Sequence, residues 1–164
     1  MAKAMLITIC LCLKLNHMVT TNQLRNEAWE VNDLLTQYVI LHNHLLKSAG
    51  TFSSLFRKID FQKLHDETVT LLEKFQEKTT ELENLAKDNL GEKERQFFDC
   101  LLSYTRALTE TVSLLSAMYY ALNEKAKGNK LSLKDHLEND KKYQVSIKNY
   151  LSYGVKLNNL YKSL

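Results

Sequence analysis

Residues 97–126 read FFDCLLSYTRALTETVSLLSAMYYALNEKA, and this stretch decides the fold. Its apolar residues recur at intervals of three and four, the spacing that gathers side chains on one face of an α-helix. The repeating positions are Leu101, Tyr104, Leu108, Thr111, Leu115, Met118 and Leu122. Val112 and Tyr119 widen this face enough for contact with more than one partner helix. The stretch therefore predicts a central helix of about 30 residues, roughly 45 Å long.

The composition favours an all-helical protein. Hydrophobic residues make up 45% of the 164 positions and charged residues 25%, which is ordinary for a folded domain with its own core. Proline is absent and only four glycines occur, whereas sheet proteins of this size need more of both at their turns. The net charge of +3 is too small to indicate a nucleic-acid partner, and none is expected.

Two segments before the central stretch show the same helical spacing. The first begins at Thr21 or Asn22, either of which can cap it, and ends at Gly50. Its inward residues are Leu24, Ala28, Val31, Leu35, Tyr38, His42 and Leu45, with Trp29, Leu34 and Leu41 beside them. The second runs from about Asp60 to Lys87. Its inward residues are Phe61, Leu64, Thr68, Leu71, Phe75, Lys78, Leu82 and Leu85.

The last helix has the clearest start signal. Ser132 precedes Asp135 by three residues, which is the spacing of a capping box. The expected inward residues are Leu133, Leu137, Asp140, Tyr143, Ile147, Tyr150, Gly154, Leu157, Tyr161 and Leu164. The side chain of Asp140 is expected to be partly exposed to solvent. Gly154 is expected to allow close approach of a neighbouring helix.

Four long helices with short connections make consecutive helices antiparallel. We therefore predict an all-α, up-down-up-down four-helix bundle over residues 22–164, with spacing typical of coiled-coil packing. The alternative is a pair of elongated helical hairpins that dimerise.

The N-terminal residues 1–21 are interpreted separately. Lys3 precedes an apolar run from Met5 to Leu13, which is too short to span a bilayer but is typical of an export signal. The sequence thus favours an exported or envelope-associated protein over a cytoplasmic one. The alternatives are an apolar extension of the bundle, or translation starting at Met18.

Charge is distributed unevenly along the chain. Residues 61–99 contain ten acids and six bases, whereas residues 125–164 contain nine lysines and three acids. In an up-down bundle the second and fourth helices are diagonally opposite. The acidic surface of the second helix and the basic surface of the fourth therefore point in opposite directions. Lys134, Lys141, Lys148 and Lys162 are spaced by multiples of seven and form one stripe, with Leu137, Ile147, Leu157 and Tyr161 expected on the buried side. This stripe is a candidate binding surface for a protein partner, a second copy, or an anionic membrane surface.

The sequence lacks the signatures of common catalytic and metal sites. A di-iron bundle needs Glu-x-x-His motifs, and no such motif occurs. Cys-x-x-Cys pairs are absent, Cys100 is expected to be a small core residue, and His42 a satisfied core histidine. We therefore expect no catalytic residues, no metal ligands and no cofactor, and a protein that acts by binding rather than as an enzyme.

Residues 44–50 read HLLKSAG, which resembles the His-x-x-Lys-Gly signature of histidine-containing phosphotransfer domains. Those domains are also four-helix bundles. The resemblance implies that His44 accepts a phosphoryl group and that Lys47 stabilises its charge. Ser48 stands where the signature has glycine, and the glycine comes at Gly50. A third hypothesis is a small-molecule sensor with a pocket among Tyr104, Tyr119, Tyr143 and Tyr150.

Overall fold

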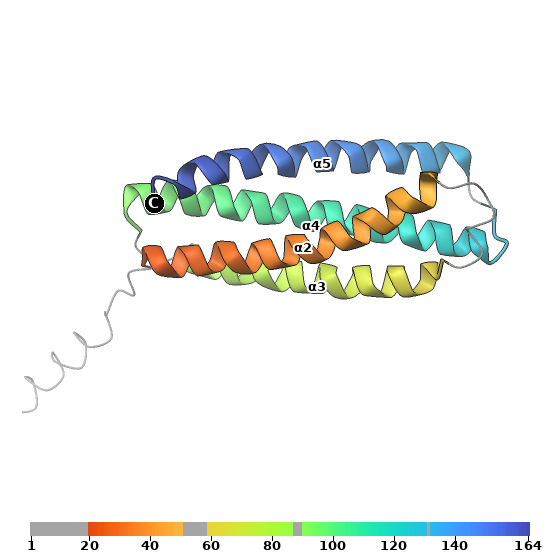
Figure 1. Ribbon diagram of the computed structural model, residues 1–164, viewed down its shortest axis with the longest axis horizontal. Helices are drawn as coiled ribbons and strands as arrows, with labels where there is room; N and C mark the ends of the chain where they lie inside the picture. Colours follow the sequence, from red (N-terminus) through yellow and green to blue (C-terminus); the bar gives the residue numbers. More distant parts are fainter. Residues whose placement is uncertain (1–19, 51–58, 87–89, 131) are drawn as a thin grey trace, which may run out of the picture.

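The computed structural model describes residues 20–50, 59–86, 90–130 and 132–164, and each stretch is built around one long helix (Figure 1). The helices are α2 (Thr21–Gly50), α3 (Phe61–Leu85), α4 (Glu92–Ala126) and α5 (Leu133–Tyr161). These four stretches contain no strand. The prediction of an all-α fold is confirmed, while the expectations for residues 1–19 lie outside the described residues.

The order of side-chain contacts shows that consecutive helices are antiparallel. Residue numbers rise along one helix of each pair as they fall along its neighbour. The pairs are Gln62 with Asn123 and Glu83 with Arg106 for α3 and α4, Phe97 with Tyr161 and Tyr104 with Tyr150 for α4 and α5, and Glu27 with Lys78 and Gln37 with Lys74 for α2 and α3. The predicted up-down-up-down bundle is thus confirmed.

Helix α4 is the centre of the bundle because it packs against each of the other three helices. Side chains across the full width of the predicted face are fully buried, including Phe98, Leu101, Leu108, Val112, Leu115 and Tyr119. The helix starts at Glu92, one and a half turns before the apolar stretch begins at Phe97. Glu92 and Glu94 lie in its first turn, where negative charge complements the helix dipole.

The predicted inward faces of α2 and α3 are also correct. On α3 every expected residue from Phe61 to Leu82 is buried, including Lys78. On α2 the expected residues are buried or half-buried, but Trp29, expected beside that face, is 60% exposed.

Among the described side chains, helix α5 departs from the prediction at one position, and the side chain of Leu133 lies outside the described residues. Tyr143, Tyr150 and Leu157 are buried as expected, and Asp140 is half-buried. Leu137, however, is 60% exposed. Each residue of a helix turns by 100°, so the two consecutive steps of three from Leu137 to Tyr143 turn Leu137 about 120° away from the buried face.

The helix ends follow local capping chemistry. Ser132 Oγ accepts a hydrogen bond from the Asp135 backbone N–H at 3.4 Å, which confirms the predicted start of α5. Thr20, rather than Thr21 or Asn22, caps α2, since its hydroxyl accepts from the Gln23 backbone N–H at 3.2 Å. Asp60 caps α3 in the same way.

Helix α4 ends at Ala126, and Gly128 follows two residues later with a φ of 93°, in the left-handed region that suits glycine. The backbone N–H of Asn129 then bonds back to the Glu124 carbonyl at 3.0 Å. This closing bond satisfies a carbonyl in the last turn and turns the chain toward α5.

Candidate functional site

The four predicted lysines of α5, Lys134, Lys141, Lys148 and Lys162, are all exposed. Three of the four exposed aliphatic side chains of α5, Leu137, Leu151 and Val155, share their side of the helix, and the fourth, Val145, lies at the edge of that side. Leu137 and Val155 are 18 residues apart, which is five whole helical turns, while Lys148 and Val155 are seven apart. We call this set of four lysines and three aliphatic residues the α5 strip. It extends about 42 Å along the helix.

The electrostatic character of the α5 strip comes from its C-terminal part. Residues 141–164 contain five lysines and no acidic residue. Lys142, outside the strip, pairs with Glu138 at 2.7 Å, and Lys156 lies 5.7 Å from the ring centre of Tyr153. None of the described ion pairs involves a lysine of the α5 strip. Its charge is therefore available to an external anionic group.

Helix α3 lies on the opposite side of the bundle and has a different surface (Figure 1). Its exposed residues are polar, and acids such as Asp66, Glu73 and Glu83 outnumber bases. None of the nine exposed large apolar side chains in the described residues lies on α3, whereas four lie on α2 and four on α5. The bundle thus has an acidic polar side and a side that is basic and apolar.

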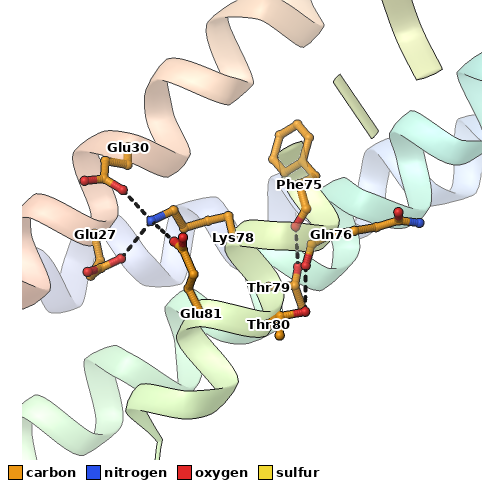
Figure 2. Close-up of polar contacts among 8 residues, drawn as sticks. All are labelled: Glu27, Glu30, Phe75, Gln76, Lys78, Thr79, Thr80 and Glu81. Atoms are coloured by element: carbon orange, nitrogen blue, oxygen red, sulfur yellow. Dashed lines mark hydrogen bonds and ion pairs between the residues drawn. The ribbon is translucent and has the colours of Figure 1, made fainter. Parts of the chain in front are cut away.

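The largest ionic cluster joins α2 to α3 at Lys78. Figure 2 shows its ammonium group between Glu27 and Glu30 of α2 and Glu81 of α3. The Nζ atom lies 3.1 Å from Glu27 and 2.6 Å from Glu81, and it also pairs with Glu30. Burial by itself lowers the pKa of Lys78, but the hydrogen bonds to Glu30, Glu81 and Glu27 outweigh it and raise that pKa above the usual value.

The three carboxylates have the spacing of a cation site, since their oxygens lie within 4.8 Å of one another. The lysine ammonium already occupies the point where their oxygens converge. The cluster is therefore a structural clamp between two helices. The spacing of α3 predicts that Lys78 faces inward, but it does not identify Glu27 and Glu30 as partners, because these belong to a helix about 50 residues earlier.

The tyrosines proposed to form a sensor pocket are core residues. Tyr104, Tyr119, Tyr143 and Tyr150 are buried, and burial raises the pKa of each one. The Tyr119 hydroxyl donates to the Leu41 carbonyl at 2.6 Å. These side chains fill the space between helices, and the hydroxyl groups of Tyr119, Tyr143 and Tyr150 find partners inside the protein.

Tyr143 also joins α5 to α2. Its hydroxyl lies 2.9 Å from the hydroxyl of Tyr38 and 2.6 Å from Nδ1 of His42. His42 is half-buried, and burial lowers its pKa. The prediction that His42 is a satisfied core histidine is confirmed.

The candidate phosphoryl acceptor His44 is exposed on α2. The side chain of Lys47 lies outside the described residues, so its expected role beside His44 stays a prediction. Cys100 is half-buried, with Sγ 3.8 Å from the Tyr153 carbonyl oxygen. Burial raises the pKa of its thiol, although Lys156 opposes that rise, so the group suits a core position better than a nucleophilic one.

None of the described helices is long and apolar enough to span a membrane. Comparison of the chain with protein-family models, curated proteins and solved structures gave no match.

Proposed function

We propose that this protein is a non-enzymatic helical bundle that binds an anionic lipid surface through the α5 strip. The observation that carries the proposal is the alignment of four exposed lysines with three exposed aliphatic side chains on one side of a single helix. Helices that lie in a membrane interface also use lysines to contact the headgroups and apolar side chains to contact the acyl chains, although they place the two on different faces. The lysines meet the headgroups and the aliphatic side chains enter the boundary with the acyl chains.

The lysines supply the larger part of the attraction. A basic residue near an anionic membrane contributes about 1 kcal/mol, so the four lysines of the strip contribute about 4 kcal/mol at low salt. Leu137, Leu151 and Val155 add the burial of their exposed apolar area. Neither group anchors the protein irreversibly, and the binding is therefore reversible and sensitive to salt.

The second candidate target of the α5 strip is an acidic protein surface. The acidic α3 of another copy of this chain is one such surface. The charges of α3 complement those of the α5 strip. The aliphatic residues of the strip favour lipid, because α3 exposes no large apolar side chain to cover them. An export signal in residues 1–21 is part of this proposal, since export brings the protein to the cell envelope.

Co-sedimentation with lipid vesicles tests the proposal. Vesicles of phosphatidylglycerol and phosphatidylcholine should retain the protein at low salt, and vesicles of phosphatidylcholine alone should not. Binding should weaken as salt rises, because the Debye length falls from about 10 Å at 0.1 M to about 3 Å at 1 M. Changing the four lysines of the strip to glutamine should abolish retention while helicity stays unchanged.

A matched control carries the same charge loss on another side of the bundle. Lys63, Lys74, Lys93 and Lys125 are exposed on α3 and α4, and their combined change to glutamine should leave vesicle binding largely intact. Equal loss of binding in both variants would show that only net charge matters. A wild-type protein that ignores anionic vesicles but self-associates at low salt would favour the partner surface instead.

A further inference from the structure

A hollow of about 270 Å³ lies between α2 and α5, on the side of the bundle where these two helices expose apolar residues. Its lining includes Trp29 and Asn32 of α2, Tyr104 of α4, and Gly154, Asn158 and Tyr161 of α5. Helix α4 therefore forms the floor of the hollow, and α2 and α5 form its two walls. None of the lining residues belongs to the α5 strip.

Gly154 lines the hollow and allows Tyr104 to approach α5 closely. A Cβ atom at that position would lie 3.3 Å from Cε2 of Tyr104, which is a tight contact. The Tyr104 ring consequently packs directly against the α5 backbone. The predicted close approach at Gly154 is confirmed, and its consequence is a flat aromatic floor.

The walls combine aromatic surface with amide groups. Trp29 borders the hollow from α2 and Tyr161 borders it from α5. Trp29 is 60% exposed, although tryptophan has the largest side chain of all residues. Asn32 and Asn158 stand on opposite walls, and in the part of the chain that the structure describes neither side-chain amide has a hydrogen-bond partner. Aromatic walls with a few polar groups are typical of small-molecule sites.

An arginine lies beside the hollow, outside its lining, next to Tyr161. Arg25 is one turn before Ala28 and Trp29, and its guanidinium carbon is 5.7 Å from the ring centre of Tyr161. Its Nε–H is buried without a hydrogen-bond partner, and Arg25 forms no ion pair with any described residue. The guanidinium as a whole is half-buried and has no acidic partner among the described residues, and a carboxylate is the acceptor that matches its geometry.

We infer that the hollow binds a small carboxylate with a flat apolar body. The body lies on Tyr104 and against Trp29, and the carboxylate reaches past the edge of Tyr161 to Arg25. The hollow is slightly smaller than the roughly 300–1,000 Å³ of drug-sized sites, so the ligand is a compact molecule.

Trp29 makes the inference directly testable, because it is the single tryptophan of the chain. We would titrate the full chain with 3-phenylpropionate and follow tryptophan fluorescence, which this ligand does not mask. A saturable change is expected, with a dissociation constant on the order of 1 mM for a ligand this small. The uncharged 3-phenylpropionamide should bind about tenfold more weakly or worse, since it loses the charge-assisted hydrogen bond.

Two kinds of variant locate the site. Arg25→Met should remove the preference for the acid over the amide, while Arg106→Met, which changes an exposed arginine paired with Glu83 on the other side of α4, should not. Ala28→Leu and Asn158→Leu each fill the hollow from a different wall, and each should abolish the fluorescence change in a protein whose circular dichroism is unchanged.

Three results would overturn the inference. The first is a wild-type protein with no saturable response to 3-phenylpropionate. The second is equal binding of acid and amide, or an acid preference that survives in Arg25→Met. The third is unaltered binding in both wall variants, which would place any bound ligand elsewhere.

Discussion

Replacing Lys78 by methionine tests the clamp between α2 and α3. Methionine keeps an unbranched apolar stem of similar reach, so the principal loss is the ammonium charge. The change leaves Glu27, Glu30 and Glu81 with carboxylate oxygens within 4.8 Å of one another and no cation among them. The folded-state pKa of Lys78 lies above its ordinary 10.5, so its contribution to stability is complete at neutral pH and is lost only as pH rises through the folded-state value.

The magnitude follows from distance and exposure. Two like charges 4.8 Å apart repel by about 1 kcal/mol in bulk water and by about 3–4 kcal/mol at an effective dielectric constant of about 20. The side chains of Glu30 and Glu81 are 58% and 51% exposed and can turn into water, whereas Glu27 is only 15% exposed and stays between the helices. Removing one partner of a fully buried pair costs about 3–5 kcal/mol. We expect a loss of about 1–3 kcal/mol here, because two of the three acids can relax.

Urea unfolding followed by far-UV circular dichroism measures this loss. For a chain of this length, each 1 kcal/mol also lowers the melting temperature by about 2–4 °C. The double variant Lys78→Met/Glu27→Gln should recover part of the stability, since it neutralises the acid that cannot escape. Lys127→Met is the control: Lys127 is exposed and pairs with Glu124 three residues earlier in the chain, so its change should cost less than about 1 kcal/mol. The clamp is refuted if Lys78→Met costs no more than this control and the double variant brings no recovery.

Four further outcomes are expected. Circular dichroism should show a helix content above about two thirds, and a substantial strand signal would contradict the fold. Leu108→Ala or Leu115→Ala should each cost about 2–5 kcal/mol in urea unfolding, whereas Leu137→Ala, on the surface, should change stability by less than about 0.5 kcal/mol. Burial lowers the pKa of His42 below its ordinary 6.5, so as the pH falls the imidazole becomes protonated in the unfolded chain before it does in the folded protein. The free energy of unfolding should therefore decrease as the pH falls below about 6.5. The variant His42→Gln should weaken that pH dependence. Iodoacetamide should label Cys100 more slowly in the folded than in the urea-unfolded protein, as read by mass spectrometry of peptides, since burial raises its thiol pKa.

The sequence predicted α3 and α4 almost completely, and the reason is the regularity of their spacing. Along α3, Phe61 to Leu82 alternate steps of three and four, so the average step matches the helical turn and the apolar face stays in one direction. The spacing predicts correctly that even Lys78 lies on the buried face, because its position follows the helical repeat although its side chain is charged. The start of α4 was missed because Glu92 to Gln96 are polar and carry no such signal.

The error at Leu137 shows where this reasoning fails. Spacing identifies the buried face only when steps of three and four alternate, since a step of three falls about 60° short of a full turn. Two such steps in a row carry the pattern away from the core, and an apolar residue at the end of them is left in water. Leu137 is a surface residue for this reason, and the residue expected to support the fold belongs to the candidate binding strip.

Neither the Lys78 clamp nor the hollow beside Trp29 was predictable from local spacing. Both depend on residues that lie far apart in the chain: Lys78 meets Glu27, and Gly154 meets Tyr104. Helical periodicity specifies which side of each helix faces inward, but not which residues of two helices meet at the same height. That information comes from the packing of the whole bundle.

The side of the bundle formed by α2 and α5 has more apolar surface than its fold requires. A helix in a bundle needs one buried face, and α2 and α5 bury theirs against α3 and α4. Eight of the nine exposed large apolar side chains in the described residues nevertheless lie on these two helices. Exposed apolar residues that gather on one side of a protein make that side a candidate for contact with another molecule. The lysine-lined strip suits an extended anionic surface and the hollow suits a compact carboxylate. These two proposed sites can be distinguished by separate variants, since changes to the lysines should affect the first and a change to Arg25 the second.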